Sequence, residues 1–234
     1  MCAFETNDKK NPSLFLVALC AVLMAFFGAL CGFILMTSIA PEPFRSVADY
    51  ESDLAENQKP KLLHAHYFRG SGSASGDWTE KRKILLEGND TTVEFTDSEI
   101  NAWIAGKFEK SRQLPLEKMS EIYAVTGLPN VFIDADEGIH FSIPLEIFWF
   151  GKKVDRLLIG QGGFLGDDSN QFSLSKLRLN EAVIPLPENL LKEYILGAVL
   201  KSFYQSVEFT ELKDAWEKVH TVELTETGIR LNLN

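Results

Sequence analysis

The chain has 234 residues, of which 45% are hydrophobic and 24% are charged, and its formal net charge is −10 at pH 7. With 16 glycines, 9 prolines and 3 cysteines, the composition excludes collagen, low-complexity disorder and a disulfide scaffold. The acidic balance argues against a nucleic-acid partner, because neutralising phosphates requires clustered lysine and arginine. The length fits one or two domains with enough apolar material for a core.

An uncharged apolar segment near the N-terminus predicts a transmembrane helix over residues 13–40. The 26 residues from Leu14 to Ile39 would form a helix about 39 Å long, at about 1.5 Å per residue, and the hydrocarbon core of a bilayer is about 30 Å thick. The alternative is a cleaved signal peptide that ends at Ala40. The apolar part of a signal peptide runs only about 7 to 15 residues, so an uncleaved anchor is favoured.

Positive charges near the ends of the span predict its orientation. Lys9 and Lys10 precede it, whereas Arg45 is the one nearby positive residue after it and lies among acidic residues. The excess of lysine and arginine marks the cytoplasmic side. We therefore expect residues 1–12 to be a cytoplasmic tail and the rest of the chain to lie outside, on the periplasmic or cell-surface side.

Small residues recur along the predicted span at a spacing that allows close approach of two helices. The expected partners of the span are the lipid bilayer and either a second copy of this chain or another membrane protein, which would bind through the transmembrane helix. The expected contact face consists of Ala21, Ala25, Gly28 and Gly32.

After the span, residues 41–80 are predicted to form an acidic stalk followed by a flexible Gly/Ser segment, RGSGSASGD, at residues 69–77. Whether that segment is a linker or an internal loop stays open. Residues 81–234 are predicted to form one extracytoplasmic domain. The 194 residues from Pro41 onward contain no cysteine, so neither disulfides nor cysteine chemistry is expected there.

The first part of this domain shows a strand and a capped helix. Residues 91–96 alternate in polarity, and Thr96 with Glu99 forms a capping box. The helix that follows should end before Pro115. Its apolar stripe has helical spacing and consists of Ile100, Trp103, Ile104 and Phe108.

From Val131 onward the apolar period changes to two, which predicts an antiparallel, curved sheet. A turn at residues 136–138 precedes a long strand over residues 139–149, and Pro144 suggests that this strand is at an edge or bulges. Further strands are expected at about 154–160 and 171–180, the second with a bulge near Ser175 and Lys176, where its apolar phase slips.

The C-terminal part predicts a helix over residues 188–204 that is apolar on almost all sides, and such a helix is buried or faces lipid. A short helix over residues 210–218 and a closing hairpin over residues 220–233 follow. The fold class is therefore α+β: one N-terminal transmembrane helix, then a domain with a curved antiparallel sheet packed on a C-terminal apolar helix.

The element order resembles that of the YpmS-like family of membrane-anchored bacterial proteins. The resemblance rests on TDSEINAWI at residues 96–104, with Asn101, and on the run from Phe172 to Pro185 that leads into an apolar helix. It covers about residues 90–234 in organisation, with few identities, and Ser175 stands where glycine is expected. The family is functionally obscure, so the resemblance implies a location and a rough fold only.

Motifs that could carry chemistry are weak in this chain. His64 and His66 lack a third metal ligand, the acidic turn at Asp134, Asp136 and Glu137 does not match an EF-hand loop, and the glycines from Gly160 to Gly166 are interpreted as a hairpin turn. The sequence therefore predicts no catalytic residue, no cofactor and no metal site.

Three functions remain at this point. The first is a non-catalytic interaction or assembly module of the cell envelope, and the second is a module that binds a lipid or another apolar ligand. An envelope hydrolase is the third. Under the second function the ligand would be lined by Phe148, Trp149, Phe150, Tyr194 and Phe203.

Overall fold

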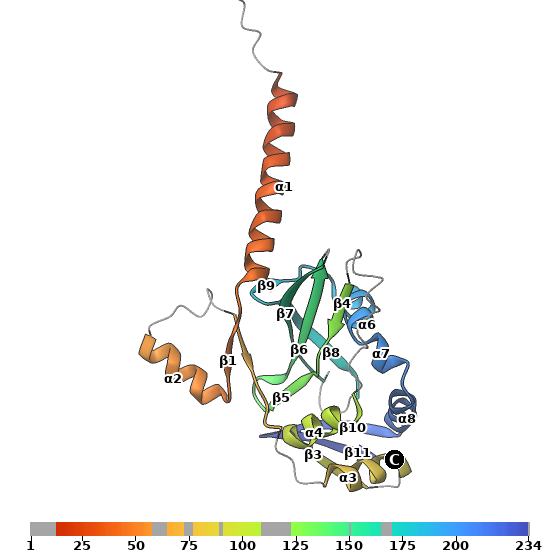
Figure 1. Cartoon of the computed structure of the whole chain (residues 1–234). Helices are drawn as coiled ribbons and strands as arrows, with labels where there is room; N and C mark the ends of the chain where they lie inside the picture. Colours follow the sequence, from red (N-terminus) through yellow and green to blue (C-terminus); the bar gives the residue numbers. More distant parts are fainter. Residues whose placement is uncertain are drawn as a thin grey trace, which may run out of the picture.

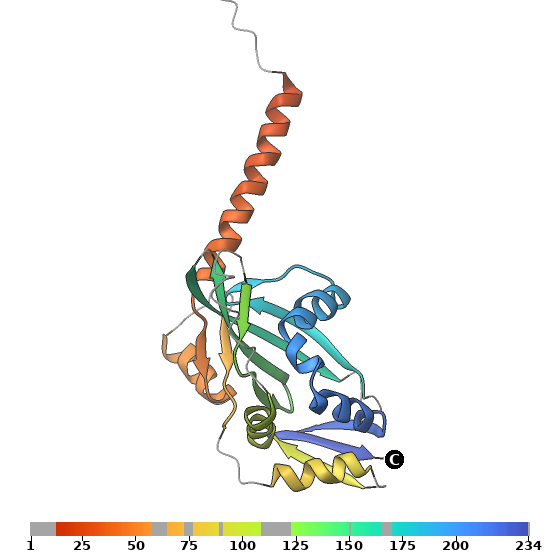
Figure 2. The same cartoon turned by 45° about the vertical axis from the view of Figure 1, so that its right-hand side comes forward.

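A computed structural model describes residues 13–57, 65–72, 77–88, 91–108, 123–149, 151–164 and 170–233. The predicted tail at residues 1–12 therefore lies outside the described residues. The fold is α+β, with one long apolar N-terminal helix, α1 (Leu14–Ser38), and antiparallel sheets. Figures 1 and 2 show α1 leaving the domain at one end, while a small sheet and its helices lie at the opposite end.

The larger sheet is antiparallel throughout and has the strand order β4-β6-β7-β8-β9, with β5 also pairing with β6. Its strands are β4 (Tyr123–Thr126), β5 (Asn130–Asp134), β6 (Gly138–Trp149), β7 (Lys152–Phe164), β8 (Phe172–Leu179) and β9 (Ala182–Val183).

The smaller sheet joins the closing hairpin to a strand from the start of the domain. Strands β10 (Val219–Thr225) and β11 (Gly228–Leu233) form the predicted hairpin, and β11 also pairs with β3 (Thr92–Thr96). The expectation of one curved sheet was therefore wrong, because β3 pairs with the C-terminal hairpin rather than with the strands that follow it. Helices α3 (Trp78–Glu87), α4 (Asp97–Lys107) and α8 (Val207–Trp216) lie beside this small sheet (Figure 1).

Each of these two antiparallel sheets has its own buried apolar cluster. Phe95 and Leu231 are almost fully buried in the cluster of the small sheet, which also includes Leu85 of α3 and Ala215 of α8. The cluster of the large sheet is built from residues of β6, β7 and β8 together with two from the C-terminal helical segment: Ile143, Leu145, Leu158, Leu174, Leu177, Leu191 and Leu196.

The capping box at the start of α4 is confirmed. The Thr96 hydroxyl accepts a hydrogen bond from the Glu99 backbone N–H, and the Glu99 carboxylate accepts one from the Thr96 backbone N–H. Glu99 is buried and also pairs with Lys81 of α3 at 2.7 Å. The helix start is thus held both by its own cap and by its neighbour.

Pro144 does not mark an edge, because β6 lies inside the large sheet. On one side β6 pairs with β7 without interruption, and on the other side β4 pairs up to Leu145 and β5 only from Ser142. The Pro144 carbonyl faces this gap, where it accepts a hydrogen bond from Gly127. In an antiparallel strand the N–H and C=O of one residue point the same way, so the missing N–H falls where no strand needs it.

The bulge predicted in β8 is confirmed at Ser175. Gln161 pairs with Lys176 and Gly162 with Leu174, which leaves Ser175 as the extra residue, and its hydroxyl donates to the Gln161 carbonyl at 2.8 Å. The glycine-rich run opposite this bulge was predicted to be a hairpin turn, and for its first three glycines that prediction is wrong. Gly160, Gly162 and Gly163 lie inside β7, while Gly166 lies outside the described residues.

The helix expected over residues 188–204 is interrupted. It consists of α5 (Glu188–Leu190), the π-helix η2 (Leu191–Leu196), α6 (Gly197–Val199) and α7 (Lys201–Tyr204), with a break at Leu200, where φ is −97° and ψ is 14°. Leu191 and Leu196 are buried on the sheet, whereas Tyr194 is 62% exposed. The segment therefore lies along one face of the sheet with its other side open, which a fully enclosed core helix would not do.

The segment expected as a stalk packs partly on the domain. β1 (Glu42–Phe44) and β2 (His66–Phe68) pair in parallel, with α2 (Val47–Asn57) between them. Phe68 is buried and stacks on Phe132, with ring centroids 4.9 Å apart. Residues 58–64 lie outside the description.

Part of the expected flexible Gly/Ser segment is fixed as well. Asn101 of α4 donates to the carbonyls of Ser71 and Val131, and Gly70 exchanges two hydrogen bonds with the Asn130 side chain. A Cβ at Gly70 would lie 2.0 Å from the Val131 carbonyl oxygen, so only glycine fits there. Residues 73–76 lie outside the description.

His140 of β6 provides a test of this packing through pH. It is buried against the Phe68 ring, and its Nε2 has no hydrogen-bond partner among the described residues. Burial lowers the pKa of His140, and the nearby Asp134 and a backbone hydrogen bond to Glu137 oppose this only in part. As pH falls below about 6.5, the unfolded chain therefore takes up a proton before the folded one does, and stability is lost.

We expect His140→Gln to reduce the fall in melting temperature between pH 7.5 and pH 5.5, measured on the full chain in detergent by circular dichroism. His220 is exposed, so His220→Gln is the matched control. We expect this variant to show the same fall in melting temperature between the two pH values as the wild type. An unchanged pH dependence in His140→Gln would show that His140 does not set it.

Candidate functional site

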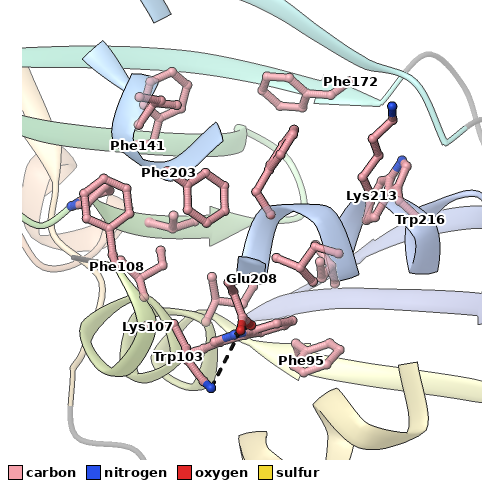
Figure 3. A pocket seen from close by; sticks show the side chains of 18 of the residues that line it. Phe95, Trp103, Lys107, Phe108, Phe141, Phe172, Phe203, Glu208, Lys213 and Trp216 are labelled. Carbon is pink, nitrogen blue, oxygen red and sulfur yellow. Dashed lines mark hydrogen bonds and ion pairs between the residues drawn. The ribbon is translucent and has the colours of Figure 1, made fainter. Parts of the chain in front are cut away.

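The candidate site is an apolar cavity of about 800 Å³ between the two sheets. One wall comes from the small sheet with α3, α4 and α8, and the other from β5, β6, β8 and the segment from η2 to α7. The cavity thus lies between the two buried clusters, and Figure 3 shows aromatic rings from both sides converging on it. Ligand sites in proteins typically measure about 300 to 1,000 Å³.

Helix α4 supplies one wall through its whole apolar stripe. Ile100, Trp103 and Ile104 line the cavity, and so does Phe108, just after the end of the helix. Trp103 also contacts Phe95, with ring centroids 5.5 Å apart. The sequence predicted this stripe, and the structure places it on the cavity, where Ile100 and Trp103 also pack against the cluster of the small sheet.

The large sheet contributes alternate residues of β6, Ile139, Phe141 and Ile143, which share one face of the strand. Glycines make room for the rings at this wall. A Cβ at Gly160 would lie 2.0 Å from the Phe141 ring, and a Cβ at Gly162 would lie 2.5 Å from the Phe172 ring. Glycine inside a strand commonly marks such a close approach.

The helical wall is held in place by ring contacts of α7, which follows the break at Leu200. Phe203 of α7 stacks on Phe108 at 5.7 Å and meets Phe209 of α8 edge-on at 5.5 Å. Ser206 caps α8 by accepting a hydrogen bond from the Phe209 N–H. Further lining residues of this wall are Leu196, Leu200, Leu212 and Trp216.

Charged groups in the lining are few, and Glu208 is the buried one. Arg82 of α3 donates to both of its carboxylate oxygens, at 2.7 and 2.8 Å, and the Trp103 indole N–H donates to it at 2.7 Å. Burial by itself would raise the pKa of Glu208, but these hydrogen bonds and the charges of Arg82 and Lys107 outweigh burial and hold the pKa below its ordinary value. Glu208 is therefore an ionised structural group.

Lysines mark the places where the cavity reaches the surface. The Lys107 Nζ lies 3.7 Å from the Glu208 carboxylate, and the Lys107 side chain is 43% exposed. Lys213 of α8 and Glu217, just after α8, are exposed as well. Figure 3 shows Lys107 beside Glu208 at one edge and Lys213 beside Trp216 at another.

Of the five aromatic residues expected around an apolar ligand, the structure places Phe203 in the cavity wall. Phe148 instead stacks on Tyr123 at 4.7 Å, and Tyr194 is exposed; neither lines the cavity. The side chain of Trp149 and all of Phe150 lie outside the described part. Sequence reasoning missed these aromatic lining residues: Phe95, Trp103, Phe108, Phe141, Phe172, Phe209 and Trp216.

The other candidate residues are not brought together. Ala21, Ala25, Gly28 and Gly32 lie on α1, and a Cβ at Gly28 or Gly32 would meet nothing within 4 Å in the single chain. His66 stacks on Tyr50 at 3.8 Å, and Asp134 accepts hydrogen bonds from the N–H groups of its own turn. Within the described ranges, no group of three or more His, Cys, Asp or Glu side chains could hold a metal ion, and His64 lies outside them.

No protein-family model matches the sequence, and no curated protein matches it. The resemblance to the YpmS-like family therefore stays a prediction.

Proposed function

We propose that this chain is a single-pass, membrane-anchored and non-catalytic protein whose domain binds the hydrocarbon part of a lipid in the cavity between its two sheets. The single observation that carries the proposal is an apolar cavity of about 800 Å³ in a domain of this size.

The energetic argument starts from the apolar surface that the unfilled cavity leaves in contact with water. The walls are almost entirely apolar, and apolar surface costs about 25 cal/mol for each Å² that stays exposed to water. Water is a poor occupant, because it needs two to four polar partners and the walls offer few. A hydrocarbon occupant removes the cost and supports the fold.

An acyl chain fits both the volume and the apolar chemistry of the site. Each buried methylene contributes about 0.8 kcal/mol, so ten of them contribute about 8 kcal/mol before the entropic costs of binding. The exposed amines of Lys107 and Lys213 stand at the rim, where an acidic headgroup would meet them. A hydrolase is less well supported, because Arg82 and Trp103 already engage the buried carboxylate of Glu208.

Membrane anchoring rests on α1, the one helix in the described part that is long and apolar enough to cross a bilayer. Its 25 residues would span about 37 Å, and they carry no charge. Lys9 and Lys10 favour a cytoplasmic N-terminus and an extracytoplasmic domain.

An interaction or assembly module of the cell envelope is the second candidate. Large apolar side chains are exposed on the C-terminal helical segment and at the start of α8, among them Tyr194 at 62% and Val207 at 75%. The small residues of α1 also leave a face open to a second helix. Cross-linking in intact membranes should recover one dominant partner under this function.

The lipid proposal is tested by native mass spectrometry of the full chain extracted from membranes in mild detergent. We expect a discrete mass adduct that corresponds to one lipid or fatty acid. Added brominated fatty acid should quench the fluorescence of Trp103 and Trp216, which line the cavity, whereas the unbrominated fatty acid should not. A chain that carries no adduct and shows no quenching would contradict lipid binding.

A further inference from the structure

The end of the domain next to α1 is a second surface of interest, because Asn180 ties α1 to the large sheet. The Asn180 side chain donates to the carbonyl of Thr37, in the last turn of α1, at 2.7 Å. The Asn180 Oδ1 accepts a hydrogen bond from the Leu157 N–H at 2.7 Å, and the Asn180 backbone N–H donates to the Leu157 carbonyl. Asn180 is buried and has a positive φ of 51°, a conformation that asparagine tolerates well.

The chain that leaves α1 is held on its other side as well. β1 pairs with β2, and hydrogen bonds from Glu42 to Ala65 and from Arg69 to Phe44 extend this pairing at both ends. Phe68 of β2 is buried on the large sheet. With contacts on two sides, the foot of α1 has a fixed place on the domain.

This attachment brings other parts of the large sheet to the level at which α1 ends. Lys152, the first residue of β7, lies five residues before Leu157. At about 3.3 Å per residue, the two residues are about 17 Å apart along the strand. Lys152 pairs with Trp149, the last residue of β6. Figures 1 and 2 both show the last part of β6 and the first part of β7 beside the foot of α1.

Apolar and aromatic side chains lie at the same end. Phe148 stacks on Tyr123, the first residue of β4. Val183 of β9, the strand that contacts α1, is 46% exposed, and Leu186 shortly after it is 41% exposed. Aromatic residues that join an apolar body to a polar end are enriched at membrane surfaces.

We infer that this end of the domain, formed by Tyr123, Phe148, Val183 and Leu186, docks on the surface of the bilayer that α1 crosses. The inference rests on the proposed anchoring by α1. The occupant is a lipid surface because α1, tied to the same end through Asn180, brings the bilayer to these residues. The small sheet with α3, α4 and α8, which forms one wall of the cavity, then lies at the end of the domain away from the membrane (Figure 1).

Charge does not drive this docking. Lys152, Lys153 and Arg156 on the β6–β7 hairpin are offset by Glu146, Asp155 and Glu181, and Lys153 is already paired with Glu146 at 2.7 Å. Docking should therefore occur on uncharged phosphatidylcholine and depend little on salt.

The test places a tryptophan at single positions of the full chain, reconstituted into phosphatidylcholine vesicles with or without brominated acyl chains. We expect Phe148→Trp and Leu186→Trp to lose most of their added fluorescence in the brominated vesicles. Val207→Trp is the matched control: it is 75% exposed at the start of α8, away from the foot of α1, and should keep its added fluorescence. The native tryptophans are present in every variant and cancel in the comparison.

Flotation of the same vesicles separates the docking from the anchoring. Protein that floats with the vesicles while Phe148→Trp and Leu186→Trp stay unquenched would overturn the docking and leave the anchor standing. Protein that does not float would overturn both. Equal quenching of all three variants, Val207→Trp included, would also overturn the docking, because the domain would then touch lipid without a preferred end.

Discussion

Replacing Arg82 with alanine is expected to destabilise the domain by about 3 kcal/mol, because it leaves the carboxylate of Glu208 buried without its main partner. Arg82 and Glu208 are both largely buried, with side chains 15% and 9% exposed, and they join α3 to α8 through two hydrogen bonds. Urea denaturation of the full chain in detergent measures the change. Because Glu208 also holds the Trp103 indole, Arg82→Ala should weaken fatty-acid binding in the cavity as well.

Arg230 gives the matched control for this prediction. It forms ion pairs with Glu94 and Glu223 on the exposed face of the small sheet, where solvent screens them, so Arg230→Ala should change stability little. A double-mutant cycle with Arg82→Ala and Glu208→Ala should show that the two losses are not additive, since either change breaks the same pair. Additive losses, or equal losses in Arg82→Ala and Arg230→Ala, would refute the structural role of this pair.

The elements that sequence predicted well are those fixed by neighbours along the chain. The capping box of Thr96 and Glu99 depends on residues three apart, and the bulge at Ser175 shows as a one-residue slip in alternation. The pairing of β11 with β3 has no such local signal, because Leu231 and Val93 are far apart in the sequence. The alternating pattern of β3 predicts a strand with one buried face and leaves its partner open.

The cavity was hidden from sequence for a related reason. A stripe such as Ile100, Trp103 and Ile104 indicates a face that avoids water, and it reads the same whether side chains or a ligand cover that face. The glycines of β7 carried the missing signal. Gly160 pairs directly with Phe141, and a glycine opposite an aromatic ring in a neighbouring strand indicates a ring folded over the backbone, but the pairing has to be known first.

Filling part of the cavity is expected to weaken lipid binding without loss of stability. Leu212 of α8 lines the cavity and is partly buried, so the larger ring of Leu212→Trp has space to occupy. We expect the affinity for fatty acid to fall at least about tenfold, which corresponds to about 1.4 kcal/mol. Stability of the lipid-free chain should stay equal to that of the wild type or rise, because the new ring replaces part of an unfilled volume. Fatty-acid titration and urea denaturation measure the two effects.

The matched control for this prediction is Leu158→Trp. Leu158 of β7 is 1% exposed in the cluster of the large sheet and does not line the cavity, so the same change there overpacks a filled core and should cost about 1 to 3 kcal/mol. The two variants add the same side chain, and they differ only in whether space is present to receive it. If Leu212→Trp destabilises the chain as much as Leu158→Trp does, the space between the sheets is closed in solution, and a hydrocarbon ligand has no site there.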